Sequence, residues 1–177
     1  MKILDRLPVI AEETEGFVGD ERMRFHKEQI IIWMSITPAD SDDPPSGLHR
    51  FPVILDTGHS FYFAMQEQHL LRLAGFSPGN LPVTGHIRHR GERVELRKAK
   101  LWLHQNEPGS TLFTQKCIRL NTIKGVEVFS DRNNHPRLPL LGLRAILGND
   151  LHLRVDGKMK LVTLSTPDWR ARIMRWL

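Results

Sequence analysis

Cysteine is almost absent from this chain. Cys117 is the only cysteine among 177 residues, so no CxxC motif occurs. A single thiol cannot close an internal disulfide, which excludes a small secreted fold held together by disulfide bonds. The fold must rest on buried apolar side chains instead. A chain of this length with 40% hydrophobic residues can supply them in one domain.

Long apolar segments are absent as well. No run approaches the ~20 residues that a membrane-spanning helix needs. At the N-terminus, Asp5 and Arg6 interrupt the stretch that would form the apolar centre of a secretion signal. The sequence therefore predicts no secretion signal, no membrane partner and a cytoplasmic location.

Positive charge is not concentrated in one place. The net charge is +5, and the most basic stretch, His86 to Lys100, also contains Glu92 and Glu95. An anionic partner would suit a basic chain, and the segment HIRHRGER offers contacts to nucleic-acid phosphates. No aromatic residues are interleaved there to stack on bases. A soluble basic protein is therefore the favoured interpretation, and nucleic-acid binding is not expected.

No complete set of metal ligands and no serine nucleophile motif can be found. His86, His89 and His104 offer imidazole ligands, but no carboxylate or cysteine completes a recognisable pattern with them. The GxSxG motif of serine hydrolases does not occur. The sequence thus predicts no metal and no cofactor.

Short runs of β-branched and aromatic residues, separated by Gly, Pro, Asn and Asp, predict an all-β chain. The expected strands are 29–36, 51–55, 61–65, a hairpin within 83–102, 117–120, 126–129, 151–155 and 159–164. The expected organisation is an N-terminal arm (1–28), one β domain (29–165) and a C-terminal amphipathic tail (166–177).

Two short helices are expected among these strands. In 66–74, Leu70, Leu71 and Ala74 precede Gly75, a residue that commonly ends helices. The second helical turn follows the apolar run at Leu138 and ends at Gly148.

The segment FPVILDTGHS, from Phe51 to Ser60, carries the chemistry. An apolar strand delivers a carboxylate, Asp56, to a turn. Thr57 can hydrogen-bond across that turn, and Gly58 lets other backbone approach closely because it has no Cβ. The simplest alternative is that Asp-Thr-Gly only turns the chain, since Asp and Gly are ordinary turn residues.

Three further features follow this motif along the chain. A segment with glycines near both ends spans Val83 to Gly91, the apolar-Gly motif Leu140–Leu143 follows, and a hairpin through Asp156-Gly157 closes the domain. Together with Asp56, they resemble the retropepsin-like aspartic proteases, the family of retroviral proteases and their cellular relatives. The resemblance covers roughly residues 29 to 165.

This resemblance implies a closed β-barrel or sandwich with a short helix after Gly142. It also implies roles for individual residues: a catalytic motif of Asp56, Thr57 and Gly58, a substrate-binding flap with Gly85, His86, Ile87 and Gly91, and a structural motif of Leu141, Gly142 and Leu143.

The implied activity is hydrolysis of peptide bonds in a peptide or protein substrate. Two aspartates held close together share one proton; one carboxylate activates water while the other protonates the scissile carbonyl. This chain has a single Asp-Thr-Gly, and 177 residues cannot hold two such lobes. The second Asp56 must therefore come from a second copy, in a homodimer with two-fold symmetry.

Two departures from the family pattern leave another interpretation open. His59 stands where the family usually has Ala or Ser, and a charged imidazole beside Asp56 would lower the pKa of its carboxyl group. The ring either points away from Asp56, lowers the pKa of the catalytic pair, or packs under the turn. In addition, Leu143 separates Gly142 from Arg144, whereas the viral enzymes have Arg directly after Gly. The alternative is a catalytically silent homodimeric binding module with a protease fold.

Overall fold

A computed structural model describes residues 1–18, 21–41, 49–89, 91–130 and 138–167. Strands dominate these residues, which confirms the all-β class. The strands are β1 (Lys2–Pro8), β2 (Thr14–Val18), β3 (Glu21–Phe25), β4 (Ile31–Pro38), β5 (Phe51–Asp56), β6 (Phe63–Gln66), β7 (Val83–His89), β8 (Glu92–Arg97), β9 (Ala99–Asn106), β10 (Phe113–Leu120), β11 (Val126–Phe129), β12 (Leu140–Gly142), β13 (His152–Asp156) and β14 (Leu161–Ser165). The helices are α1 (Glu67–Ala74), the 3₁₀ turn η1 (Pro78–Asn80) and α2 (Leu143–Gly148). Most of the expected C-terminal tail, residues 168–177, lies outside the described residues.

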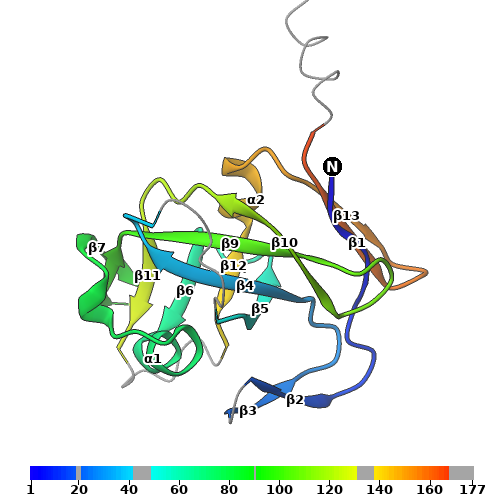
Figure 1. Cartoon of the computed structure of the whole chain (residues 1–177), viewed down its shortest axis with the longest axis horizontal. Coiled ribbons are helices and arrows are strands. Elements are labelled where there is room, and N and C mark those ends of the chain that lie inside the picture. Colours follow the sequence, from blue (N-terminus) through cyan, green and yellow to red (C-terminus); the bar gives the residue numbers. More distant parts are fainter. Residues whose placement is uncertain (19–20, 42–48, 90, 131–137, 168–177) are drawn as a thin grey trace, which may run out of the picture.

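The main sheet has nine strands in the order β10-β9-β4-β5-β12-β6-β11-β8-β7. In Figure 1, β9 and β4 run across the molecule whereas β6 and β11 run nearly upright, so the sheet twists strongly. The expectation of a closed barrel is wrong. Closure requires the first and last strands to pair, but β10 and β7 stand at opposite ends of this sheet.

The centre of this sheet places the Asp56 motif beside the Gly142 motif. β12 lies between β5 and β6, parallel to β5 and antiparallel to β6. Leu55 is opposite Leu141, and Asp56 is opposite Gly142. Two segments more than 80 residues apart in the sequence thus end side by side.

The two faces of this central region differ in character. Val53, Leu55, Phe63 and Leu141 belong to the main apolar core. The alternate residues point the other way, and on that face Ala64, Val94 and Phe129 form a smaller buried cluster with Ile87 and Leu140 packed against it. Asp56 alternates with Leu55 and therefore lies on the face of the smaller cluster.

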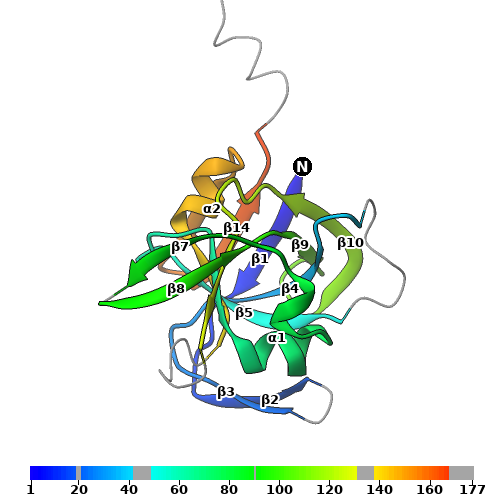
Figure 2. The same ribbon diagram turned by 90° about the vertical axis from the view of Figure 1, so that its left-hand side faces the viewer.

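The N-terminal arm contains three strands that no period in the sequence predicted. β1 pairs antiparallel with β14, and its Ile3, Leu4 and Leu7 are fully buried in the main core. β2 and β3 form a separate hairpin. In Figure 2 this hairpin lies at the base of the molecule, below α1.

Both helices occur where the sequence predicts them. α1 ends at Gly75, whose φ of +80° closes the helix in the left-handed conformation that glycine adopts without strain. Its buried face differs in one detail from the expectation, because Leu73 is buried and Leu71 is 57% exposed. α2 follows Gly142 directly, so the β12-to-α2 corner is sharp.

Candidate functional site

The site is built around the turn that follows β5. Asp56 is half-buried, and its Oδ1 atom accepts a hydrogen bond of 2.8 Å from the backbone N–H of Gly58. The backbone N–H of His59 donates to the carbonyl of Asp56 at 3.2 Å. These bonds close an Asx-type turn. Thr57 and Gly58 are exposed at its tip, beside the carboxyl group.

Gly142 is the point where three backbone segments meet. Its N–H donates to the Tyr62 carbonyl at 3.0 Å, and the N–H of Leu143 donates to the His59 carbonyl at 3.1 Å. A Cβ at position 142 would lie 2.0 Å from the carbonyl oxygen of Phe61 and 2.7 Å from that of His59. Only glycine fits there. The predicted structural motif is therefore adjacent to Asp56, with Leu141 fully buried and Leu143 37% exposed.

The predicted flap is the β7–β8 hairpin, but its residues separate into two groups. Ile87 packs against the smaller apolar cluster, on the face that carries Asp56. His86 is exposed, and its ring nitrogens lie 3.1 to 3.2 Å from the guanidinium of Arg93. Gly91 has a φ of +88° in the turn, and Gly85 pairs with Leu96. The structure thus brings Ile87 toward the site and leaves His86 outside it.

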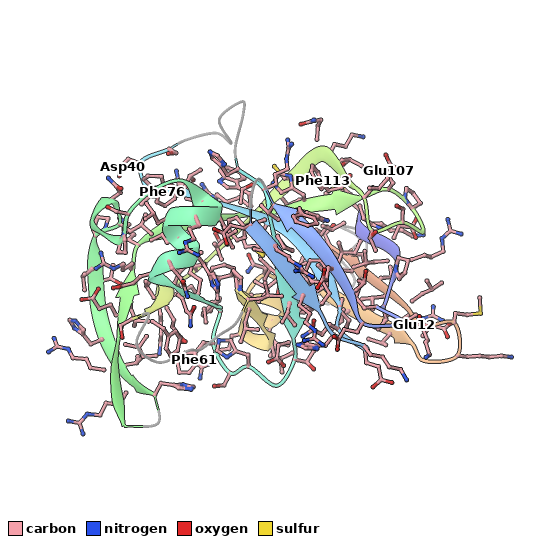
Figure 3. All side chains as sticks on the ribbon, turned by 90° about the horizontal axis from the view of Figure 1, so that it is seen from below. Glu12, Asp40, Phe61, Phe76, Glu107 and Phe113 are labelled. Carbon is pink, nitrogen blue, oxygen red and sulfur yellow. The ribbon has the colours of Figure 1, made fainter. Side chains whose placement is uncertain are left out.

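A series of four rings connects the Asp56 turn with the hairpin, and sequence reasoning did not identify it. Phe61 lies 5.8 Å from the His59 ring and 6.5 Å from the His89 ring, between centroids. His89 in turn meets Phe129 edge-on at 5.4 Å. In Figure 3, Phe61 lies between the loop that carries it and the green β7–β8 hairpin. His89 could have been found from its two-residue spacing from Ile87, which places both on one face of the strand.

Glu127 is the second functional candidate that sequence reasoning missed. It is only 1% exposed, and its Oε2 atom faces Nε2 of His59 at 3.8 Å. Burial raises the pKa of the Glu127 carboxyl group to about 8, although the positive charge of Arg144 partly opposes the shift. The signal was present in the sequence, since a glutamate interrupts the apolar run Val126–Phe129.

His59 is packed inward under the turn, with a side chain 10% exposed. Burial lowers the pKa of His59; Asp56 opposes the shift by raising it, and His89 adds to the lowering. The imidazole is therefore neutral over more of the pH range than an exposed one. This weakens the effect expected of a charged His59 on Asp56.

A cavity of about 250 Å³ lies between β3, α1, β5 and the segment that precedes β12. Ile54 lines it, and because side chains alternate along a strand, Ile54 and Asp56 share one face of β5. Arg72 of α1 and Glu21 of β3 approach to 3.5 Å and both line the cavity. Its other apolar walls are Met23, Leu73 and Leu138. This cavity can receive an apolar side chain two residues along the strand from Asp56.

The histidines named as metal-ligand candidates do not gather into one site. His86 and His89 lie on β7 and His104 on β9, with six strands between them. His104 is buried and its Nε2 lies 2.9 Å from the Ser35 hydroxyl. Within the described ranges, no three His, Cys, Asp or Glu side chains are grouped to hold a metal ion. None of the helices described there is long and apolar enough to cross a membrane.

Comparisons with protein-family models, with curated proteins and with solved structures find no match to this chain.

Proposed function

We propose that this protein is a retropepsin-like aspartic endopeptidase whose active site contains Asp56 from two copies of the chain. The observation that carries the proposal is the pairing of Asp56 with Gly142 on the parallel strands β5 and β12. The Asx-type turn holds the carboxyl group half-exposed at the end of a buried strand. This gives an acid a fixed orientation together with access to water and substrate.

The chemistry requires two such acids. With two Asp56 carboxyl groups in contact, one proton is shared because both cannot ionise at that separation. The ionised carboxylate takes a proton from a water molecule, which attacks the scissile carbonyl, and the protonated one donates to the carbonyl oxygen. Neutral His59 leaves this shared proton less disturbed than a charged imidazole would.

The surface around the turn suits contact with a second copy. Thr57 and Gly58 are exposed at the tip. Leu143 and Leu147, one helical turn apart on α2, are 37% and 65% exposed. Apolar side chains are typical of the centre of a homodimer interface. A two-fold axis beside Thr57 would therefore cover these leucines and bring the two carboxyl groups together.

A peptide or protein substrate would bind as an extended strand on the face that carries Asp56. The β7–β8 hairpin would cover it through Ile87 and His89, and the cavity beside Ile54 would take one apolar side chain. A cytoplasmic location is kept as part of this proposal.

The alternative function is a homodimeric protease-fold module that binds peptides without cutting them. The observation that favours it is His59, which occupies a position beside the acid where the family uses small residues. Both functions require the same dimer, so only a cleavage assay separates them.

The deciding experiment incubates the purified chain with a mixed peptide library over about pH 4 to 8 and identifies new termini by mass spectrometry. The endopeptidase proposal expects cleavage by the wild type and none by Asp56→Asn. Equal cleavage by both proteins would refute Asp56 as the acid. Dimer formation and peptide binding without any cleavage would establish the alternative.

A further inference from the structure

Glu127 interrupts a row of apolar side chains across the sheet. The strand register places Ile54, Leu140, Ala64, Glu127 and Leu96 opposite one another on five neighbouring strands. Four members of the row are apolar, and the fifth is a carboxyl group in the most buried part of the face. A residue of this type is rare at such a position unless it has a polar partner.

The only ion-pair contact of Glu127 in the described residues is His59. Both carboxyl oxygens of Glu127 and the Nε2 atom of His59 are buried and make no hydrogen bond there. The Oε2–Nε2 distance is 3.8 Å, so a shift of about 1 Å would bring the two atoms into hydrogen-bonding range. Leaving them apart costs free energy for each group, whereas a single bond between them satisfies Nε2 and one oxygen together.

His59 is well placed to transmit such a bond to Asp56. Its backbone N–H donates to the Asp56 carbonyl, and its own carbonyl accepts from Leu143. Its ring rests on Gly142, where a Cβ would lie 2.9 Å from the ring Cδ2 atom. The ring therefore lies between the turn and the start of α2. A hydrogen bond that fixes the rotation of the ring would also hold the turn in place.

We propose that Glu127 is a positioning residue whose carboxyl group hydrogen-bonds to Nε2 of His59 and so holds the turn that carries Asp56. The consequence for catalysis rests on the proposed function, but the hydrogen bond itself does not. Below the pKa of Glu127, its neutral carboxyl group donates to Nε2, and the ring proton is on Nδ1. Above it, the carboxylate can only accept, so the proton moves to Nε2.

The charged groups that face this pair come from α2, from the Asp56 turn and from β7. Arg144 of α2 faces Glu127 and favours its ionised form. Asp56 and His89 face His59, with opposite effects on the pKa of the imidazole. The ring signals of His89 on the hairpin must therefore be followed together with those of His59.

The first test follows the ring ¹⁵N chemical shifts of His59 and His89 in the full chain from about pH 5 to pH 10. In the wild type, the His59 shifts should show an inflection near pH 8, where Glu127 titrates. Glu127→Gln keeps a donor but cannot titrate, so the inflection should vanish. Glu95→Gln, on the neighbouring strand β8, is the matched control and should keep it. A wild type without the inflection, or an unchanged inflection in Glu127→Gln, would overturn the hydrogen bond.

The second test measures cleavage below pH 8. Glu127→Leu should lower kcat by about tenfold or more with KM nearly unchanged, because a small misplacement of a catalytic group is costly. Glu127→Gln should recover most of kcat. Glu127→Leu removes the cost of burying a carboxyl group but leaves Nε2 of His59 without its partner. These two effects oppose each other, so the melting temperature of Glu127→Leu should change little. Unchanged kcat in Glu127→Leu would overturn the positioning role. An inactive wild type would refute the proposed function, and the ¹⁵N shifts of the first test would then decide whether the hydrogen bond exists.

Discussion

In the described part of the chain, the turns after β5 and β13 each begin with an aspartate that accepts backbone hydrogen bonds. Asp56 accepts from the N–H of Gly58 at 2.8 Å. Asp156, at the end of β13, accepts from the N–H groups of Lys158 and Met159 at 3.1 and 2.9 Å. The local chemistry is the same, because a short carboxylate readily caps the backbone that follows it.

The surroundings of the two turns are very different. A Cβ at Gly157 would have no atom within 4 Å other than those of its chain neighbours. In Figure 1 the hairpin that contains this turn extends to the right, away from the main sheet. The Asp56 turn packs against Gly142, and it also lies beside the largely buried His59 ring and the buried Glu127. The two turns share the same local hydrogen bonding, so the elements packed against the Asp56 turn are what make it a candidate site.

The two turns should differ most in how a substitution of their aspartate affects peptide cleavage. Asp56→Asn should lower peptide cleavage by about a thousandfold or more, since the carboxylate that is proposed to transfer protons is lost. The asparagine oxygen still accepts from Gly58, so the fold should persist. Asp156→Asn is the matched control and should cleave like the wild type. Measured kcat/KM values for the two variants check this, and comparable losses in both would remove the distinction between the turns.

Backbone crowding gives the next largest difference. Gly142→Ala should destabilise the fold by about 3 kcal/mol or more, because the new Cβ would overlap the Phe61 carbonyl. Gly157→Ala should change the free energy of unfolding by less than about 1 kcal/mol, since its site is open. Urea denaturation measures both. Equal stabilities for the two variants would contradict the close packing at Gly142.

The buried acid behind the Asp56 turn should make stability depend on pH. The pKa of Glu127 is raised from 4.5 to about 8 in the folded protein. Between these values the unfolded chain is ionised while the folded one holds its proton, so stability present below pH 4.5 is lost as pH rises toward 8. The loss should be on the order of 2 kcal/mol or more.

Urea denaturation of the wild type and Glu127→Gln at several pH values isolates this contribution. The difference between the two proteins should change steadily between pH 4.5 and 8 and then level off. A difference that is constant with pH would show that Glu127 titrates normally.

The smallest expected effect concerns assembly. Leu147 on α2 and Met159 in the exposed hairpin are 65% and 63% exposed, so they are equally accessible apolar side chains. Leu147→Asp should weaken the proposed dimer by about tenfold or more, because a charge would be buried at the interface. Met159→Asp should not. Sedimentation at several concentrations measures both, and equal weakening would move the interface away from the Asp56 face.

Part of the fold could be predicted from the sequence because the signals are local. The apolar run before Asp56, the helix ending at Gly75 and the hairpin closed by Asp156 each follow from residues within one short window. The burial of Leu73 in place of Leu71 shows the limit of that reasoning, since the orientation of α1 is set by what it packs on. The strands of the N-terminal arm were missed because β1 forms only by pairing with β14 at the other end of the domain.

Asp56 and Gly142 could be singled out from the sequence. The sequence could not predict that Glu127, Phe61 and His89 lie near them. Their contacts arise from the order of strands in the sheet, in which β11 lies beside β6 and β12 beside β5. Ring contacts and burial depend on this order, and the sequence pattern of one segment carries no information about its neighbour in the sheet. The open sheet was missed for the same reason, because pairing of edge strands is a non-local property.

By itself, then, the sequence determined the all-β class, the turn at Asp56 and the need for glycine where backbone must approach backbone, because these depend on the stereochemistry of a few consecutive residues. Only the tertiary structure decided that the sheet stays open, that the His59 ring packs inward and that Glu127 lies next to it. Burial and proximity are properties of the packed molecule, and they raise the pKa of Glu127 and form the surroundings of Asp56.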